Sequence, residues 1–188
     1  MPEMMTDSLK HFLPLYHLPQ FVILGMPLLA RPFNQFLIIW PPLGSIDTLG
    51  TCAAMVIISI FSFGLPKLLK NERAAKRWAL LACLAAFGMF VIYISLVGRY
   101  VIRINTPFNG VYVRSVGFTV SPDARAQQPN MNNAELLKWG GLEEESIEKV
   151  WTPASVLELR LCLLITFTLM LGFTNFVIGA VADLQHKR

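Results

Sequence analysis

Three long runs without a charged side chain constrain this chain more than any other feature. No Asp, Glu, Lys or Arg occurs from Thr48 to Pro66, from Trp78 to Gly98 or from Leu161 to Ala182. An α-helix needs about 20 apolar residues to cross a hydrocarbon core of about 30 Å, and each run is close to that length. The sequence therefore predicts an α-helical polytopic membrane protein, and it disfavours a soluble enzyme, a coiled coil or a disordered chain.

The predicted transmembrane helices extend somewhat beyond these runs. The first two, over about 48–69 and 78–98, form a helical hairpin (48–98) that is closed by the basic loop 67–77. The third spans about 152–182 and belongs to a C-terminal unit, 152–188, with a short basic tail. Its start is marked either by Thr152 with Pro153 at the first helical position, or by Ser155 with Glu158 as a capping box.

The N-terminal segment, residues 1–47, is apolar but rich in proline. Half of the chain's twelve prolines lie between residues 11 and 47. A proline inside a helix costs about 3 kcal/mol, and unpaired backbone groups cannot face lipid. We expect short interfacial or re-entrant pieces here, with a broken fourth span over 19–40 as the alternative.

The net charge of +4 comes largely from a few clustered cations. Five of them lie in the loop 67–77, and Lys187 and Arg188 end the chain. This clustering is typical of cytoplasmic anchoring, so we expect no specific binding of duplex nucleic acid. The same rule favours a cytoplasmic loop and C-terminus, although arginines near the end of the second span leave the side of the intervening segment open.

That intervening segment, residues 99–151, is the only sizeable polar part of the chain and is called the polar module below. Its first half has two β-rich runs around Asn109-Gly110, a strong hairpin signal. Its second half predicts two short helices. Asn132 or Asn133 caps the first, which ends at Gly140-Gly141, and LEEESIEKVW forms the second.

The predicted hairpin suggests an anion site. A two-residue turn at Asn109-Gly110 pairs 105 with 114 and 103 with 116, which gathers polar side chains on one face. The members of this face are Arg99, Arg103, Asn105 and Arg114. Three arginines could bind a lipid headgroup, an anionic small molecule or a nucleotide. Alternatively they are headgroup anchors, neutralised by the acidic residues Glu143, Glu144, Glu145 and Glu148, which we otherwise expect to form a solvated helix face without a metal.

Small and polar residues form one stripe on the third helix. Its members are Thr168, Gly172, Asn175, Gly179 and Asp183, spaced by four, three, four and four residues. Small residues let helices approach closely in a membrane, and Asn or Thr seeks a hydrogen-bonding partner there. The stripe could join copies of the chain around a pore, with Asp183 at its mouth favouring cations. The alternative is packing against the first two helices of the same chain.

Nothing in the sequence points to catalysis, a metal or a cofactor. The three histidines are scattered, and no glycine-rich phosphate loop follows a predicted strand. The cysteines, Cys52, Cys83 and Cys162, lie inside the predicted spans, where we expect buried, inert thiols.

These features lead to two hypotheses. The first is a non-enzymatic, homo-oligomeric channel-like or membrane-perturbing effector gated by its polar module. By analogy of architecture alone, it would act in bacterial stress or anti-phage defence, in the bacterial inner membrane, with membrane lipid as a partner. The second is a structural or assembly subunit of a larger membrane complex.

Overall fold

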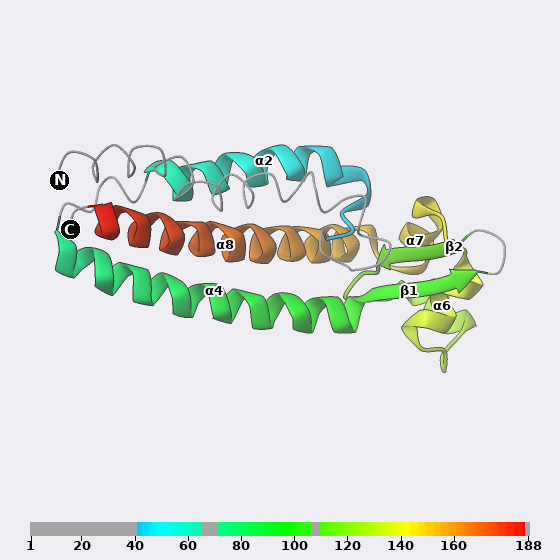
Figure 1. Cartoon of the computed structure of the whole chain (residues 1–188). Helices are drawn as coiled ribbons and strands as arrows, with labels where there is room; N and C mark the ends of the chain where they lie inside the picture. Colours follow the sequence, from blue (N-terminus) through cyan, green and yellow to red (C-terminus); the bar gives the residue numbers. More distant parts are fainter. Residues whose placement is uncertain (1–40, 65–70, 107–109, 187–188) are drawn as a thin grey trace, which may run out of the picture.

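A computed structural model describes residues 41–64, 71–106 and 110–186, which are mostly helical with one two-stranded sheet. Three helices lie side by side, and the polar module sits at one end of them (Figure 1). In chain order the elements are η1 (Gly44–Ile46), α2 (Asp47–Ser59), η2 (Ile60–Gly64), α4 (Glu72–Tyr100), β1 (Val101–Thr106), β2 (Gly110–Ser115), α5 (Pro122–Gln127), α6 (Asn133–Gly140), α7 (Glu144–Val150) and α8 (Pro153–His186). The assembly of α2, η2, α4 and α8 is called the bundle.

Two of the three predicted spans are confirmed as long apolar helices. By length and composition, α4 and the segment Pro153–Ala182 of α8 could each cross a membrane. The first predicted span is not confirmed, because its α-helical part has only 13 residues and continues as the π-helical turn η2. Gly64 ends this turn and Pro66 follows two positions later in the sequence, and both are poor helix formers. The expected end at Leu69 and the N-terminal segment up to residue 40 lie outside the described residues.

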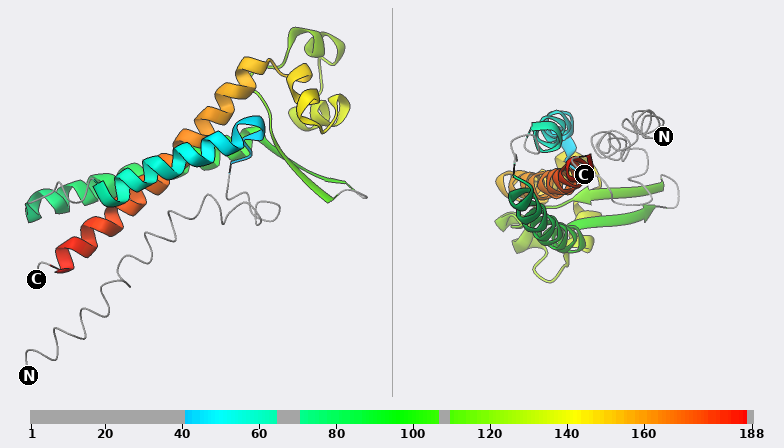
Figure 2. Two further views of the ribbon diagram at one scale, coloured as in Figure 1. Left: turned by 90° about the horizontal axis from the view of Figure 1, so that it is seen from above. Right: turned by 60° about the vertical axis from the view of Figure 1, so that its left-hand side comes forward.

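The core of the bundle lies where α8 contacts both α2 and α4. On α4, the buried residues Ala75, Ala82 and Tyr93 share one edge, and the alanines let the two long helices approach closely. Tyr93 packs against Phe167 of α8, with ring centroids 5.4 Å apart. Figure 2 shows the three helices from two further directions, with the hairpin extending beyond the end of the bundle.

The outer face of α4 is apolar and exposed. Leu80, Leu84 and Phe87 keep 64%, 62% and 67% of their surfaces accessible. All three cysteines are also exposed, so the expectation of buried thiols is wrong. They lie on faces of the helices that the other described residues leave exposed, and the length of an uncharged run does not distinguish those faces.

The hairpin of the polar module has a different register from the predicted one. Thr106 pairs with Gly110 and Asn105 with Val111, so residues 107–109 connect the strands. The prediction took Asn109-Gly110 as the centre of a two-residue turn, whereas Gly110 is the first residue of β2. The partner of each β1 residue therefore lies three positions earlier in the sequence than the predicted partner. A shift by an odd number of residues reverses which side chains share a face.

The helices of the polar module follow their sequence signals more closely. Asn132 caps α6 in a reciprocal capping box with Glu135, and Gly141, with φ of 107°, ends the helix as predicted. The short helix α5, which starts at Pro122 after the cap Ser121, was not predicted. The long helix α8 begins at Pro153, which confirms the first of the two starts proposed for the third predicted span.

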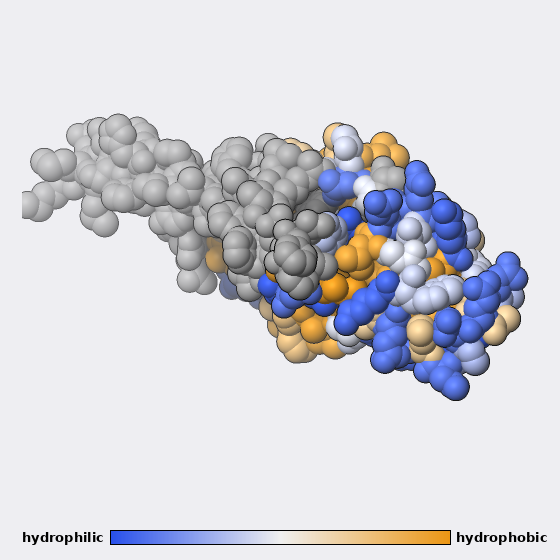
Figure 3. All heavy atoms as spheres, turned by 90° about the vertical axis from the view of Figure 1, so that its right-hand side faces the viewer, coloured by the Kyte–Doolittle hydropathy of each residue, from blue (hydrophilic) through white to orange (hydrophobic). Residues whose placement is uncertain are grey.

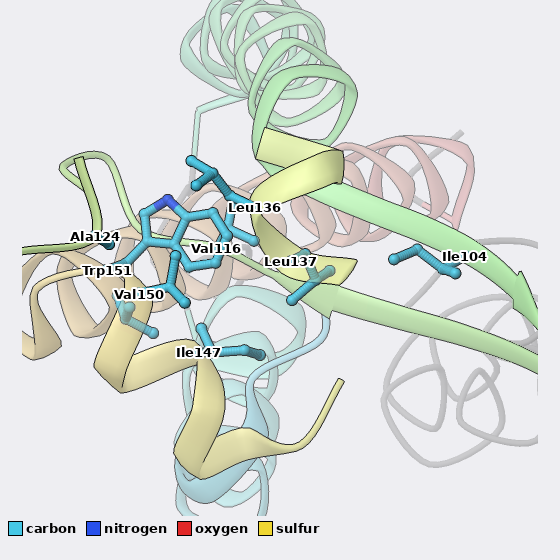
Figure 4. Close-up of a cluster of buried hydrophobic side chains, with 9 residues drawn as sticks. Ile104, Val116, Ala124, Leu136, Leu137, Ile147, Val150 and Trp151 are labelled. Atoms are coloured by element: carbon cyan, nitrogen blue, oxygen red, sulfur yellow. The ribbon is translucent and has the colours of Figure 1, made fainter. Parts of the chain in front are cut away.

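A second hydrophobic core fills the polar module. Trp151 is fully buried at its centre, among Val116, Leu136 and Ile147 (Figure 4). An antiparallel bridge between Val120 and Trp151 ties the segment after β2 to the end of α7. This core includes Val156 of α8, and it lies beneath a largely hydrophilic surface (Figure 3).

Candidate functional site

The stripe on α8 faces the interior of its own chain. Thr168 and Asn175 are 2% and 0% exposed, and Gly172 and Gly179 are buried. A Cβ added to Gly172 would lie 3.1 Å from the Phe61 ring, closer than most side-chain contacts, so the ring would have to shift to accept a larger residue. The described members of the stripe therefore adopt the intramolecular packing that the sequence left open as an alternative.

A buried hydrogen-bond chain fixes the centre of this contact. The Asn175 amide Nδ2 donates to Ser62 Oγ of η2 at 2.5 Å, and the Ser62 hydroxyl donates to the carbonyl of Ile58 at 2.6 Å. Ser62 lies in the π-helical turn, so the irregular end of the first helix presents a polar partner to α8. The side chain of Asp183 lies outside the described residues.

Thr168 differs from the neighbouring threonines of α8. Thr166 and Thr174 donate to backbone carbonyls of Cys162 and Met170, one turn earlier. The Thr168 hydroxyl is buried and has no hydrogen-bond partner among the described residues. A buried hydroxyl without a partner lowers the stability of the folded state.

A second polar cluster joins the bundle to the polar module and is called the junction site: Arg160, Glu144, Ser115 and the carbonyl of Pro42. The Arg160 side chain is 3% exposed, and its Nη1 lies 2.6 Å from Glu144 Oε1 of α7. Its Nε donates to Ser115 Oγ of β2 at 3.3 Å, and the Ser115 hydroxyl donates to Pro42 O at 2.7 Å. One guanidinium thus connects α8, α7, β2 and the segment before η1.

The backbone at Gly44 closes over the ion pair of the junction site. Gly44 has φ of 59°, a conformation that favours glycine, and a Cβ at this position would lie 2.8 Å from Arg160 Cζ. The preceding residue, Leu43, is buried in the core of the bundle. The guanidinium is therefore enclosed by the chain, whereas the Glu144 side chain keeps 35% of its surface exposed.

The sequence reasoning missed the junction site. Arg160 directly precedes the longest uncharged run, and it was counted only as the border of that run. Glu144 was expected on a solvated face, which holds for the exposed residues Glu143, Glu145 and Glu148 but not for Glu144 itself. A charged residue next to an apolar span, with acidic residues nearby in the polar module, was the available signal, but sequence spacing does not show which carboxylate it meets.

The predicted three-arginine face is not formed. Arg99 belongs to the last turn of α4 rather than to the hairpin, and its guanidinium lies over the Tyr100 ring. Arg103 pairs with Val113 and Arg114 with Ile102, so these two arginines point to opposite faces of the sheet. The misplaced turn is the cause, because the odd shift in register moved Arg114 to the other face.

Arg114 instead contributes to the packing of the polar module. It is half-buried, and its Nε donates to the carbonyl of Leu142 at 3.1 Å. Its guanidinium also lies 5.6 Å from the centroid of the Tyr112 ring. Binding of an anion by Arg99, Arg103 and Arg114 together has no geometric basis in this arrangement.

The chemistry of the described residues and the comparisons with known proteins give no further assignment. Within 41–64, 71–106 and 110–186, no group of three or more His, Cys, Asp or Glu side chains could hold a metal ion. The chain matches no protein family model, no curated protein sequence and no solved structure.

Proposed function

We propose that the chain is an integral membrane protein whose bundle is embedded in the bilayer. The outer face of α4 supports this proposal, because only 11% of the most apolar 18-residue stretch of this helix is buried inside the chain. Apolar helices inside soluble proteins bury such residues, and a contiguous exposed apolar surface is typical of contact with lipid or protein. In a bilayer, lipid would cover this face without any further partner.

The proposed orientation follows from the charges at the two ends of the bundle. Arg73, Lys76 and Arg77 lie in the first turns of α4, at the end opposite the polar module (Figure 1). Positively charged segments beside a span favour the cytoplasmic side. The polar module would then lie on the other side of the membrane.

In function, we propose a non-enzymatic scaffold, a structural or assembly subunit that holds the polar module at the membrane. The observation that carries this proposal is the burial of the α8 stripe within one chain. A pore needs polar side chains that face its axis, but Thr168 and Asn175 are enclosed by the bundle. The channel hypothesis would require α8 to leave this packing, so the scaffold fits the geometry better.

Native mass and ion flux test the scaffold against the channel. The purified full chain in detergent should show no closed ring by native mass spectrometry or single-particle imaging. Liposomes that contain it should hold a cation gradient as well as protein-free liposomes do. Closed rings together with a cation flux would overturn the scaffold and restore the channel.

A further inference from the structure

The junction site is one of the contacts through which a movement of the polar module would reach the bundle, beside the hydrogen bonds of Thr119 with Thr152 and Ser155 at the start of α8. The module meets α8 through α7 and β2, and both elements bond to the same guanidinium. The Ser115 hydroxyl accepts a hydrogen bond from Arg160 Nε and donates one to the carbonyl of Pro42, just before η1 and α2. A displacement of α7 would therefore act on α8 through Arg160, and on the segment before α2 through Arg160 and Ser115.

The two charges of this pair differ in their access to solvent. The Arg160 side chain is 3% exposed, whereas that of Glu144 is 35% exposed. Arg160 is therefore fixed inside the junction, and Glu144 is the partner that can exchange its contact for water. Well-packed apolar residues often stabilise a protein as much as a buried ion pair does. Stability alone therefore does not account for an ion pair at this position.

We propose that the Arg160–Glu144 ion pair is a latch that fixes the orientation of the polar module on the bundle. When the latch opens, α7 and the rest of the module move relative to α8 while both parts stay folded. The bundle and the module each have a hydrophobic core, and the two meet at Val156 of α8 and at Tyr100, which packs against both, so the proposed movement pivots about these two residues. The proposal does not depend on whether the protein acts as a scaffold or as a channel.

The test measures the distance between the module and the bundle in the full chain. With the native cysteines replaced by alanine, spin labels are placed at the exposed positions 138 of α6 and 84 of α4, and pulsed dipolar spectroscopy is recorded in lipid nanodiscs. The parent protein should give one narrow distance. Glu144→Gln should add a second population or broaden the first. The matched control Glu145→Gln, one residue along α7 and exposed, should keep the parent distance.

A double variant separates the latch from a general loss of stability. Arg160→Met with Glu144→Leu removes both charges and leaves neither one buried alone. This variant should keep the helical circular dichroism of the parent and still lose the narrow distance. If it folds and keeps the single parent distance, or if Glu144→Gln does so, the ion pair is not a latch.

Discussion

At the scale of single residues, the contact between Asn175 and Ser62 decides how α8 is interpreted. Polar residues at helical spacing in a span are expected both where copies of a chain associate and where helices of one chain pack. The sequence predicted the stripe and the need of Asn175 for a partner. It could not identify that partner, because Ser62 is 113 positions away and lies in a π-helical turn.

Removing the Ser62 hydroxyl should destabilise the single chain. Ser62→Ala takes away the acceptor of a buried amide, and leaving such a group without its partner costs about 1–3 kcal/mol. Denaturant unfolding in detergent, followed by circular dichroism, measures this loss. The control Ser95→Ala, on the exposed side of α4 where Ser95 donates back to Val91 O, should change the free energy of unfolding by less than about 0.5 kcal/mol. A lower oligomeric mass with unchanged unfolding would instead place the contact between chains.

Thr168 should respond in the opposite direction. Thr168→Val keeps the shape of the side chain and replaces a buried hydroxyl that has no partner among the described residues. The substitution should leave the free energy of unfolding unchanged or raise it by about 1 kcal/mol. The same denaturant titration measures it. A clear loss of stability would show that this hydroxyl has a partner in the protein, as expected if the stripe lined a polar path.

At the scale of elements, sequence signals that act over a few residues were sufficient to predict where several helices begin and end. The stop at Gly141 is found where the sequence indicated it, and the cap at Asn132 and the start at Pro153 are each one of the two alternatives that the sequence left open. The hairpin exists, but its register depends on which strand residues reach the core of the module. Ile104 is 7% exposed and belongs to that core, a tertiary constraint that the dipeptide Asn109-Gly110 does not contain.

The capping box of α6 gives a prediction at this scale. Asn132→Ala removes the acceptor of the Glu135 backbone N–H, which should lower the stability of the module by about 1 kcal/mol. Asn130→Ala, on an exposed neighbouring position outside the helix, is the control and should change little. Amide hydrogen exchange should speed up in α6 while α4 and α8 keep their rates. Equal exchange in both proteins would contradict a stabilising role of the cap.

At the scale of the whole molecule, the sequence predicted two long helices but not the connections between distant segments. Uncharged runs located these two helices, whereas the division of the chain into a bundle and a separate polar module stays a prediction. The junction site was missed because it joins residues from four segments, and only their arrangement in space brings Glu144 to Arg160. The shared arginine face failed for a related reason, since it depended on one assumed strand register.

The claim that the bundle lies in a bilayer is tested most directly by labelling Cys83. This residue is exposed on α4, so in water it would react freely, whereas in lipid a polar maleimide could not reach it. In native membranes made permeable to the reagent, we predict that Cys83 stays unlabelled until the membranes are dissolved in denaturing detergent. A cysteine at exposed position 126 of α5, introduced as Ala126→Cys, should label throughout. Equal labelling of positions 83 and 126 in intact membranes would contradict the proposed membrane embedding.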